Sequence, residues 1–468
     1  MADGGAGGDQ LVLTAVLGVA VLLVALLLFR GRTAATAPPE KATGSAAAAD
    51  GDALKAGRAQ APKTPTPKGG PSTKRPQHGK KAKAPASGHS WLVNMLKGHT
   101  GRITSVEMTP DDKAVVTAAD DRTLRLWPVK GLTHRPPPSV VCNIELDYAK
   151  HLSFSPDGKA CLAAMGQEHV LRLYRVDRKG KGNEGVLSHK RQVPAGPPFA
   201  FAVVGCGLSV ANPVTRVGCT YLMAATADTE LRYMTVDGDT LQTIDTKMMA
   251  QNHACLSADG RFTAVAGRLG RVRLVEVHGK GGSFVKAATV TDLSGLSGEA
   301  QHAAFSPCSR AVVGVGSGGS WAVWDVSVEF DRGADAREIG RGTFKHPGDG
   351  TMAVCAIAAD LDIVAVGCGY RISLHSAVAG KLLETIDDAH IGGIITGVTF
   401  DAASNYVVSA GGMDKRICVW KNVAGKVRLR ERLQRELARA AGNRAMEDHL
   451  QFQIAEATAF IDSVQAAA

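Results

Sequence analysis

The residue types that most often carry chemistry are scattered in this 468-residue sequence. Its nine cysteines stand singly, and no two form a Cys-x-x-Cys pair. An odd, unspaced set favours free thiols in a reducing compartment such as the cytosol over disulfides or a zinc site. His99 could be a metal ligand or a catalytic base, but no second His or Cys lies at ligand spacing. Gly-x-Ser-x-Gly, His-Glu-x-x-His and Gly-x-x-x-x-Gly-Lys-Ser/Thr are missing, so we expect no enzyme, no cofactor, no metal and no small-molecule substrate.

A basic segment offers a second kind of chemistry, the binding of anions. Residues 30–90 hold twelve Lys or Arg and three acidic residues, so they contribute +9 of the formal charge of +10 and leave the rest nearly neutral. Clusters in this segment could bind anionic lipid or RNA, or mimic a nuclear localisation signal. The alternative is a solvated linker that its own charge keeps extended. The candidate contacts are Lys74, Arg75, Lys80, Lys81 and Lys83.

The elements that must position any site begin with a hairpin over residues 115–127, VVTAADDRTLRLW. A β-branched run leads into the turn residues Asp120 and Asp121, and a second alternating run ends at Trp127. A further alternating run over residues 103–108 precedes it and ends in its own turn signal. Three strands within thirty residues are typical of a propeller blade.

Similar runs recur along the chain. Turn signals such as Ser155-Pro156-Asp157-Gly158 separate them, and the spacing of the runs varies between 42 and 59 residues. This regularity predicts an all-β, seven-bladed propeller over residues 91–422. The third strands of the seven blades are expected at Trp127, Tyr174, Tyr233, Val275, Trp324, His375 and Trp420.

The run that follows Gly98-His99 and ends at Trp127 resembles the WD-repeat family, whose repeats begin with Gly-His and end with a Trp-Asp-like pair. In that family a His, a strand Ser or Thr, a turn Asp and the terminal Trp form a buried hydrogen-bonded chain. The resemblance assigns two such tetrads to this sequence, in the first and last blades, which meet where the ring closes. The first tetrad is His99, Thr117, Asp121 and Trp127, and the last tetrad is His390, Ser409, Asp414 and Trp420.

The N-terminus predicts a membrane anchor. Residues 11–29 are nineteen consecutive uncharged residues, which as a helix would span about 28 Å and match a bilayer core. A cleaved signal peptide ending near Ala37 is the alternative. Acidic residues before the apolar run, with Arg30 and Arg32 directly after it, favour a retained single-pass anchor whose C-terminal side is cytosolic.

The chain after Trp420 changes to a helical pattern, with apolar residues at intervals of three and four. A helical hairpin that folds on itself or on the propeller is one interpretation, and a partner-binding helix is the other. The expected segments are a lumenal N-terminus (1–10), a transmembrane anchor (11–29), a disordered basic linker (30–90), the propeller (91–422) and an α-helical tail (423–468).

Longer strings, among them NIELDYAKHLSFSPDGKA from Asn143 and WAVWDVSVEF from Trp321, resemble WD-repeat proteins of the endoplasmic reticulum membrane. The resemblance implies a non-enzymatic scaffold with a cytosolic propeller that takes part in the unfolded-protein response or in translational control. It also implies protein partners, among them the stress-activated initiation-factor kinase of that membrane. The alternative function is an RNA- or ribosome-associated tether that uses the basic linker.

Overall fold

The computed structural model describes residues 89–132, 138–178, 185–193, 198–212, 218–440 and 444–465. The predicted anchor at 11–29 and the basic clusters of the linker lie outside these residues. Among the helices of the described ranges, none is both long and apolar enough to cross a membrane.

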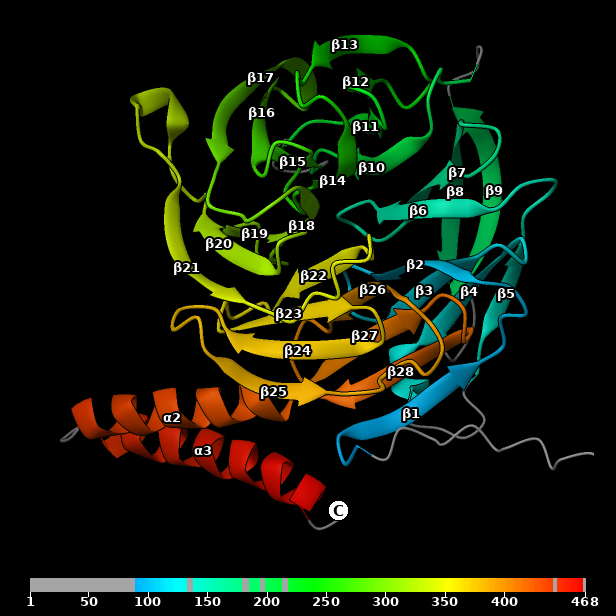
Figure 1. The fold of residues 1–468 in the computed structure, drawn as a ribbon. Coiled ribbons are helices and arrows are strands. Elements are labelled where there is room, and N and C mark those ends of the chain that lie inside the picture. Colours follow the sequence, from blue (N-terminus) through cyan, green and yellow to red (C-terminus); the bar gives the residue numbers. More distant parts are fainter. Residues whose placement is uncertain are drawn as a thin grey trace, which may run out of the picture. The chain divides into compact units, whose positions relative to one another are not determined.

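The described strands form seven four-stranded antiparallel sheets arranged as a ring, which confirms the predicted seven-bladed propeller (Figure 1). Each of the seven expected third-strand positions lies in the third strand of its sheet. Blades one to three are β2 (Ile103–Met108), β3 (Ala114–Ala119), β4 (Thr123–Pro128) and β5 (Val140–Asn143); β6 (Ala149–Phe154), β7 (Ala160–Met165), β8 (Leu171–Arg178) and β9 (Gly185–Val193); and β10 (Val203–Ser209), β11 (Tyr221–Thr226), β12 (Glu230–Met234) and β13 (Thr240–Asp245).

Blades four to six follow the same order from the innermost to the outermost strand. They are β14 (Gln251–Leu256), β15 (Phe262–Gly267), β16 (Val272–Lys280) and β17 (Ser283–Leu293); β18 (Ala300–Phe305), β19 (Ala311–Gly316), β20 (Ser320–Asp325) and β21 (Arg337–Thr343); and β22 (Ala353–Ile357), β23 (Ile363–Cys368), β24 (Arg371–Ser376) and β25 (Leu382–Ile386). Short 3₁₀ turns, η1 (Val129–Gly131) and η2 (Phe330–Arg332), lie after β4 and β20.

The seventh blade joins the two ends of the propeller sequence. It consists of β26 (Ile395–Phe400), β27 (Tyr406–Gly411), β28 (Arg416–Lys421) and, as its outermost strand, β1 (Leu92–Lys97). β1 pairs antiparallel with β28, and the amide of Lys421 donates to the carbonyl of Trp91. The closure needs no covalent link, because backbone hydrogen bonds across this sheet connect residues more than 300 positions apart.

The core lies between neighbouring blades. The second strands β3, β11, β15, β19 and β23 are buried along their whole length, because each is covered on both faces by the adjoining sheets. Strands covered on both faces need apolar residues at every position, and these runs are accordingly rich in Val and Ala. The outermost strands alternate between exposed and half-buried residues instead.

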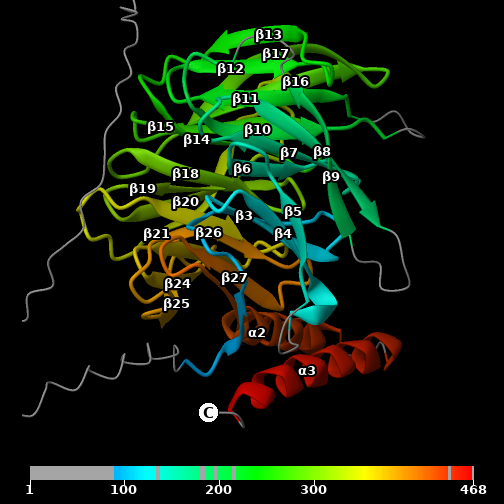
Figure 2. The same ribbon diagram turned by 90° about the vertical axis from the view of Figure 1, so that its right-hand side faces the viewer.

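Two antiparallel helices, α2 (Val423–Arg439) and α3 (Arg444–Gln465), follow β28 and form a hairpin at one edge of the propeller (Figures 1 and 2). The side chain of Asn422 accepts from the amide of Gly425 and so caps the start of α2. Val423, Ile461 and Val464 pack together with Trp91. The helical tail is thus a hairpin that folds on itself and on the propeller, as one of the two interpretations of the sequence proposed.

Candidate protein-binding face and central channel

The structure places the four residues of the first tetrad in one hydrogen-bonded chain. The indole Nε1 of Trp127 donates to Oγ1 of Thr117 at 3.0 Å, and Oγ1 lies 2.8 Å from Nε2 of His99. Nδ1 of His99 lies 3.1 Å from the carboxylate of Asp121. Because a carboxylate can only accept, Nδ1 of His99 carries the proton donated to Asp121, and Nε2 of the neutral ring accepts from the hydroxyl of Thr117.

The last tetrad has the same arrangement. Nδ1 of His390 lies 2.8 Å from Asp414, Nε2 lies 2.8 Å from Oγ of Ser409, and the indole of Trp420 donates to that oxygen at 2.9 Å. Both imidazoles have lost nearly all contact with water. Every polar atom of each ring has a hydrogen-bond partner within the tetrad, as buried polar groups require.

Electrostatics supports this neutral arrangement in the first tetrad. Burial lowers the pKa of His99, and the neighbouring Asp121 only partly opposes this effect. Burial by itself would raise the pKa of Asp121, but hydrogen bonds from the Thr123 hydroxyl and the Thr100 amide, together with His99, lower it to about 2. At neutral pH the pair is therefore a carboxylate that accepts from an uncharged imidazole.

The innermost strands enclose a central channel of about 860 Å³. Six of the seven carry a β-bulge near their start, and β22 is the exception. A bulge leaves one residue unpaired and re-aims its side chain. At these positions three polar side chains donate to carbonyl groups in or next to the following inner strand. Thr104 donates to Ala149 at 2.6 Å, Asn252 to Ala300 at 2.9 Å, and Gln301 to Thr351 at 3.1 Å.

Three histidines follow such bulges and line the channel: His151, His253 and His302, in blades two, four and five. The rings of His253 and His302 stack at 3.8 Å between centroids, and that of His151 lies 6.1 Å from His253. The intervening blade has Gly205 at this position, where a Cβ would lie 2.1 Å from the carbonyl oxygen of Ala254. The glycine thus permits the close approach of β10 and β14.

Burial keeps several ionisable groups of the channel wall uncharged at neutral pH, while Arg102 and Lys150 also line the channel. Burial lowers the pKa of His253 to about 4 and raises that of the half-buried Glu107 to about 8. Burial also raises the pKa of the thiols of Cys206 and Cys255 to about 12. Protonated thiols are poor nucleophiles, so these groups suit hydrogen bonding and packing better than covalent chemistry.

Strand direction divides the connections between two faces of the propeller. We call the blade-joining face the one that holds the connections between blades and those between second and third strands. The opposite face holds the remaining connections. β28 ends on the opposite face, so α2 begins on that face. β1 starts on the same face, because it runs antiparallel to β28. Neither β1 nor α2 begins on the blade-joining face.

Among the connections between strands, large apolar side chains are exposed mainly on the blade-joining face. Eight residues of its connections are between 37% and 79% exposed. In the described connections of the opposite face, only Val378 belongs to the same class of exposed large apolar residues. Three of the eight are methionines, whose flexible side chains adapt to differently shaped partners. The eight are Leu146, Phe201, Met249, Leu269, Met352, Tyr370, Ile394 and Met413.

The backbone around two of these residues is also unusual. Leu146 and Met249 have φ angles of 64° and 63°, a left-handed conformation that costs free energy for residues other than glycine. Both side chains are more than 70% exposed, so burial does not repay this cost. Such conformations are concentrated at ligand contacts.

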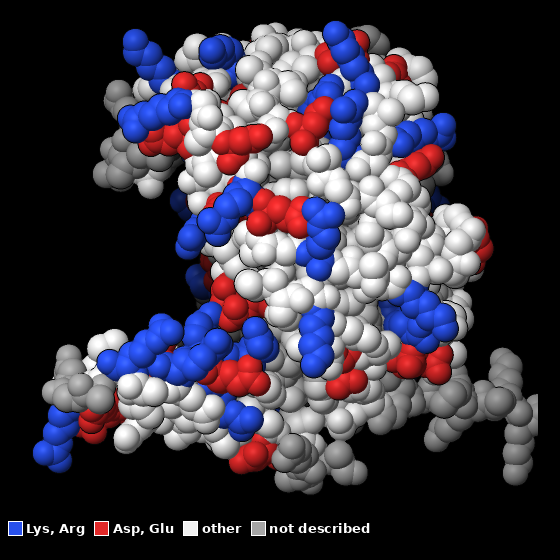
Figure 3. All heavy atoms as spheres, turned by 60° about the vertical axis from the view of Figure 1, so that its left-hand side comes forward, with Lys and Arg blue, Asp and Glu red and all other residues white. Residues whose placement is uncertain are grey.

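A different surface, on α2, is strongly basic. α2 has six Lys or Arg and only Glu431 and Glu436 as acidic residues. Lys and Arg side chains gather along the projecting helical arm, whereas charges of both signs mix over the rest of this side (Figure 3). One of them, Arg432, pairs with Asp362 of the propeller at 2.6 Å. Half-exposed pairs of this kind contribute little stability, about 0–1 kcal/mol.

Sequence comparisons agree with this structure. The family model described as "WD domain, G-beta repeat" matches residues 90–128 and 380–421. These two ranges contain the two tetrads and the pairing of β1 with β28. The chain is a seven-bladed β-propeller whose first and last blades match the WD-repeat model.

Among curated proteins the chain is similar to transducin beta-like protein 2. It is 28% identical to the Homo sapiens protein over 379 residues, covering 81% of this chain and 82% of the relative. The Mus musculus protein gives 28% identity over 380 residues, 81% of this chain and 83% of the relative. A shorter similarity links it to U3 small nucleolar RNA-associated protein 15 of Saccharomyces cerevisiae, with 29% identity over 102 residues, 21% of this chain and 19% of the relative.

Proposed function

We propose that the protein is a scaffold anchored in the endoplasmic reticulum membrane, with its propeller in the cytosol and its partner proteins bound to the blade-joining face. The observation that carries this proposal is the concentration of exposed apolar side chains on that one face. Loop surfaces of a propeller suit protein binding, since they are broad and are held by a rigid ring. Apolar side chains on loops that share one face of a rigid scaffold are placed to contact a partner protein.

The anchoring part of the proposal depends on residues 11–29 and on the resemblance to membrane-anchored WD-repeat proteins. Protease added outside intact microsomes should digest the propeller and leave the first ten residues protected. A protected propeller, or a mature chain that begins after Ala37, would contradict the anchor. This topology experiment is independent of the test of the binding face.

The binding face is tested with the stress-activated initiation-factor kinase, the partner class that the resemblance implies. We expect its purified cytosolic portion to bind the chain, and a triple serine variant of the most exposed apolar residues to weaken binding at least tenfold. Each lost apolar contact removes about 1–2 kcal/mol, so three suffice for that factor. The variant is Leu146→Ser, Met249→Ser and Met413→Ser.

A matched control carries the same number of serine substitutions at exposed apolar residues outside this face. It is Val285→Ser, Val378→Ser and Leu382→Ser. If the control weakens binding as much as the test variant, the partner binds elsewhere on the propeller. If both variants bind the kinase as tightly as the unchanged chain does, the blade-joining face is not the binding surface for this kinase.

A further inference from the structure

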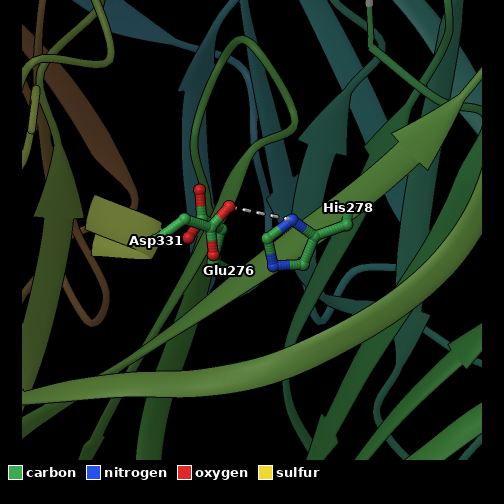
Figure 4. Close-up of side chains that lie close together, drawn as sticks. All are labelled: Glu276, His278 and Asp331. Atoms are coloured by element: carbon green, nitrogen blue, oxygen red, sulfur yellow. Dashed lines mark ion pairs between the residues drawn. The ribbon is translucent and has the colours of Figure 1, made fainter. Parts of the chain in front are cut away.

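Three potential metal ligands converge between blades four and five on the opposite face. Glu276 and His278 are two residues apart on β16, so their side chains share one face of the strand. Asp331 comes from η2, in the connection between β20 and β21. One ligand atom from each of the three lies within 4.8 Å of the others, and Nδ1 of His278 lies 4.0 Å from Oδ2 of Asp331 (Figure 4).

Glu276 provides an independent indication that a ligand belongs here. Its side chain is only 4% exposed, and its Oε1 accepts from Nε of Arg261 at 2.7 Å. Its other oxygen, Oε2, is buried and has no hydrogen-bond partner. A carboxylate oxygen removed from water without a partner is costly to the fold, and a bound cation would supply that partner.

Contacts outside the triad hold Asp331 in place. Nη2 of Arg261 donates to the carbonyl of Val328 at 3.1 Å, which fixes the start of the connection that carries Asp331. The ring of Phe330 packs edge-on against Phe262, with 5.6 Å between centroids. The connection therefore also lies against blade four through contacts that the ligand side chains do not make directly.

We propose that Glu276, His278 and Asp331 bind a Zn²⁺ ion that clamps the connection of blade five to blade four. One imidazole with two carboxylates suits zinc, whereas Mg²⁺ and Ca²⁺ prefer ligand sets made of oxygen alone. Arg261 holds the carboxylate of Glu276 through Oε1 and leaves Oε2 free for the ion, as hydrogen bonds around metal-bound carboxylates commonly do. Water fills the fourth position.

Little movement is needed to close the site. Ligand atoms around tetrahedral zinc lie about 3.3 Å apart, which follows from bonds of about 2.0–2.1 Å. The side chain of Asp331 is 75% exposed and that of His278 is 25% exposed, so both can turn towards the buried oxygen of Glu276. The clamp is separate from the blade-joining face and goes beyond the partner binding proposed above.

The first experiment is a calorimetric titration of the full chain, stripped of metal with a chelator, with Zn²⁺ and separately with Mg²⁺. We expect one equivalent of Zn²⁺ to bind and Mg²⁺ not to bind. His278→Gln and Asp331→Asn should each weaken zinc binding at least about tenfold. Asp335→Asn changes an exposed acid of the same connection outside the triad, so it should bind zinc as the unchanged chain does. Because Asp331 is exposed and His278 is only partly buried, the test does not depend on Glu276→Gln, which would also leave Arg261 without its ion-pair partner.

Two further readouts separate this site from the free cysteines. Co²⁺ in the zinc site should give visible bands without the near-ultraviolet band of a cobalt–thiolate bond. Zinc should also slow tryptic cleavage after the exposed Arg332, because the clamp covers the connection. The proposal is overturned if no zinc binds, if both ligand variants bind zinc as tightly as the unchanged chain, or if cobalt gives the thiolate band.

Discussion

The first tetrad makes a quantitative prediction for Thr117→Val. Valine has nearly the shape of threonine, and Thr117 is fully buried, so the change removes the hydroxyl without leaving a cavity. Two buried groups then lose their partner, the indole N–H of Trp127 and Nε2 of His99. Each unsatisfied buried group costs about 1–3 kcal/mol, so we expect a loss of about 2–6 kcal/mol in the free energy of unfolding.

The assay is equilibrium unfolding in urea, with Thr263→Val as the matched control. Thr263 is equally buried in a second strand, but its hydroxyl serves one partner, the hydroxyl of Tyr233 at 3.0 Å. The control should therefore cost about half as much, or about 1–3 kcal/mol. Equal losses for the two variants would refute the reasoning, because the cost would then reflect the loss of any buried hydroxyl and not the number of groups it satisfies.

Three further predictions concern the channel and the linker. Burial lowers the pKa of His253 in the folded chain to about 4, below the 6.5 of an exposed histidine, so the unfolded chain binds the proton first as the pH falls. Stability should therefore be full above about pH 6.5 and fall towards about pH 4. His253→Gln should flatten this profile, measured as the urea midpoint against pH, by up to about 1.4 kcal/mol per pH unit. Gly205→Ala should destabilise the fold by more than about 2 kcal/mol in thermal unfolding, because its Cβ would meet the backbone of Ala254. Gly333→Ala is the control: open space surrounds this residue, so the change should cost only the strain of a left-handed alanine, about 1–2 kcal/mol. Neutralising the five basic linker residues should leave the melting temperature unchanged. If the linker binds anionic lipid, co-sedimentation with acidic vesicles should fall, and if it binds RNA, the salt dependence of RNA binding should flatten. If neither changes, the segment is a spacer.

The repeat pattern could be predicted from sequence because blade formation depends on local information. Turn residues such as Asp120 and Asp121, and alternation that ends in Trp127, are visible within a window of thirty residues. The blade count followed from the same signal even where the terminal residue was Val275 or His375. Those strands still carry the alternation and the burial of a third strand.

The channel histidines and the zinc ligands were not predictable in this way. His151, His253 and His302 are far apart in sequence, and only the bulges of separate inner strands turn them into one channel. Glu276 and His278 alternate on one strand and look like ordinary polar positions. Their relation to Asp331 depends on how the connection after β20 folds back, for which the sequence has no local signal.

The exposed apolar residues show why the binding face also needed the structure. Leu146 and Met413 stand singly in polar connections, and a single exposed apolar residue means little. Only the direction of each strand assigns them to the same face. Once strand order is known, the assignment is forced, because antiparallel strands send alternate connections to opposite faces.

The two tetrads lie at the two junctions of the blade that closes the ring. His99 follows β1, the last strand of blade seven, and its partners belong to blade one, so the first tetrad ties blade seven to blade one. His390 follows β25 of blade six, and its partners belong to blade seven, so the last tetrad ties that blade to its other neighbour. Blade seven is also the only blade, within the described sheets, whose strands come from both ends of the propeller sequence. A ring that closes by backbone pairing alone would open first at that blade, and directional hydrogen bonds between fully buried groups are the interactions that resist such opening most strongly.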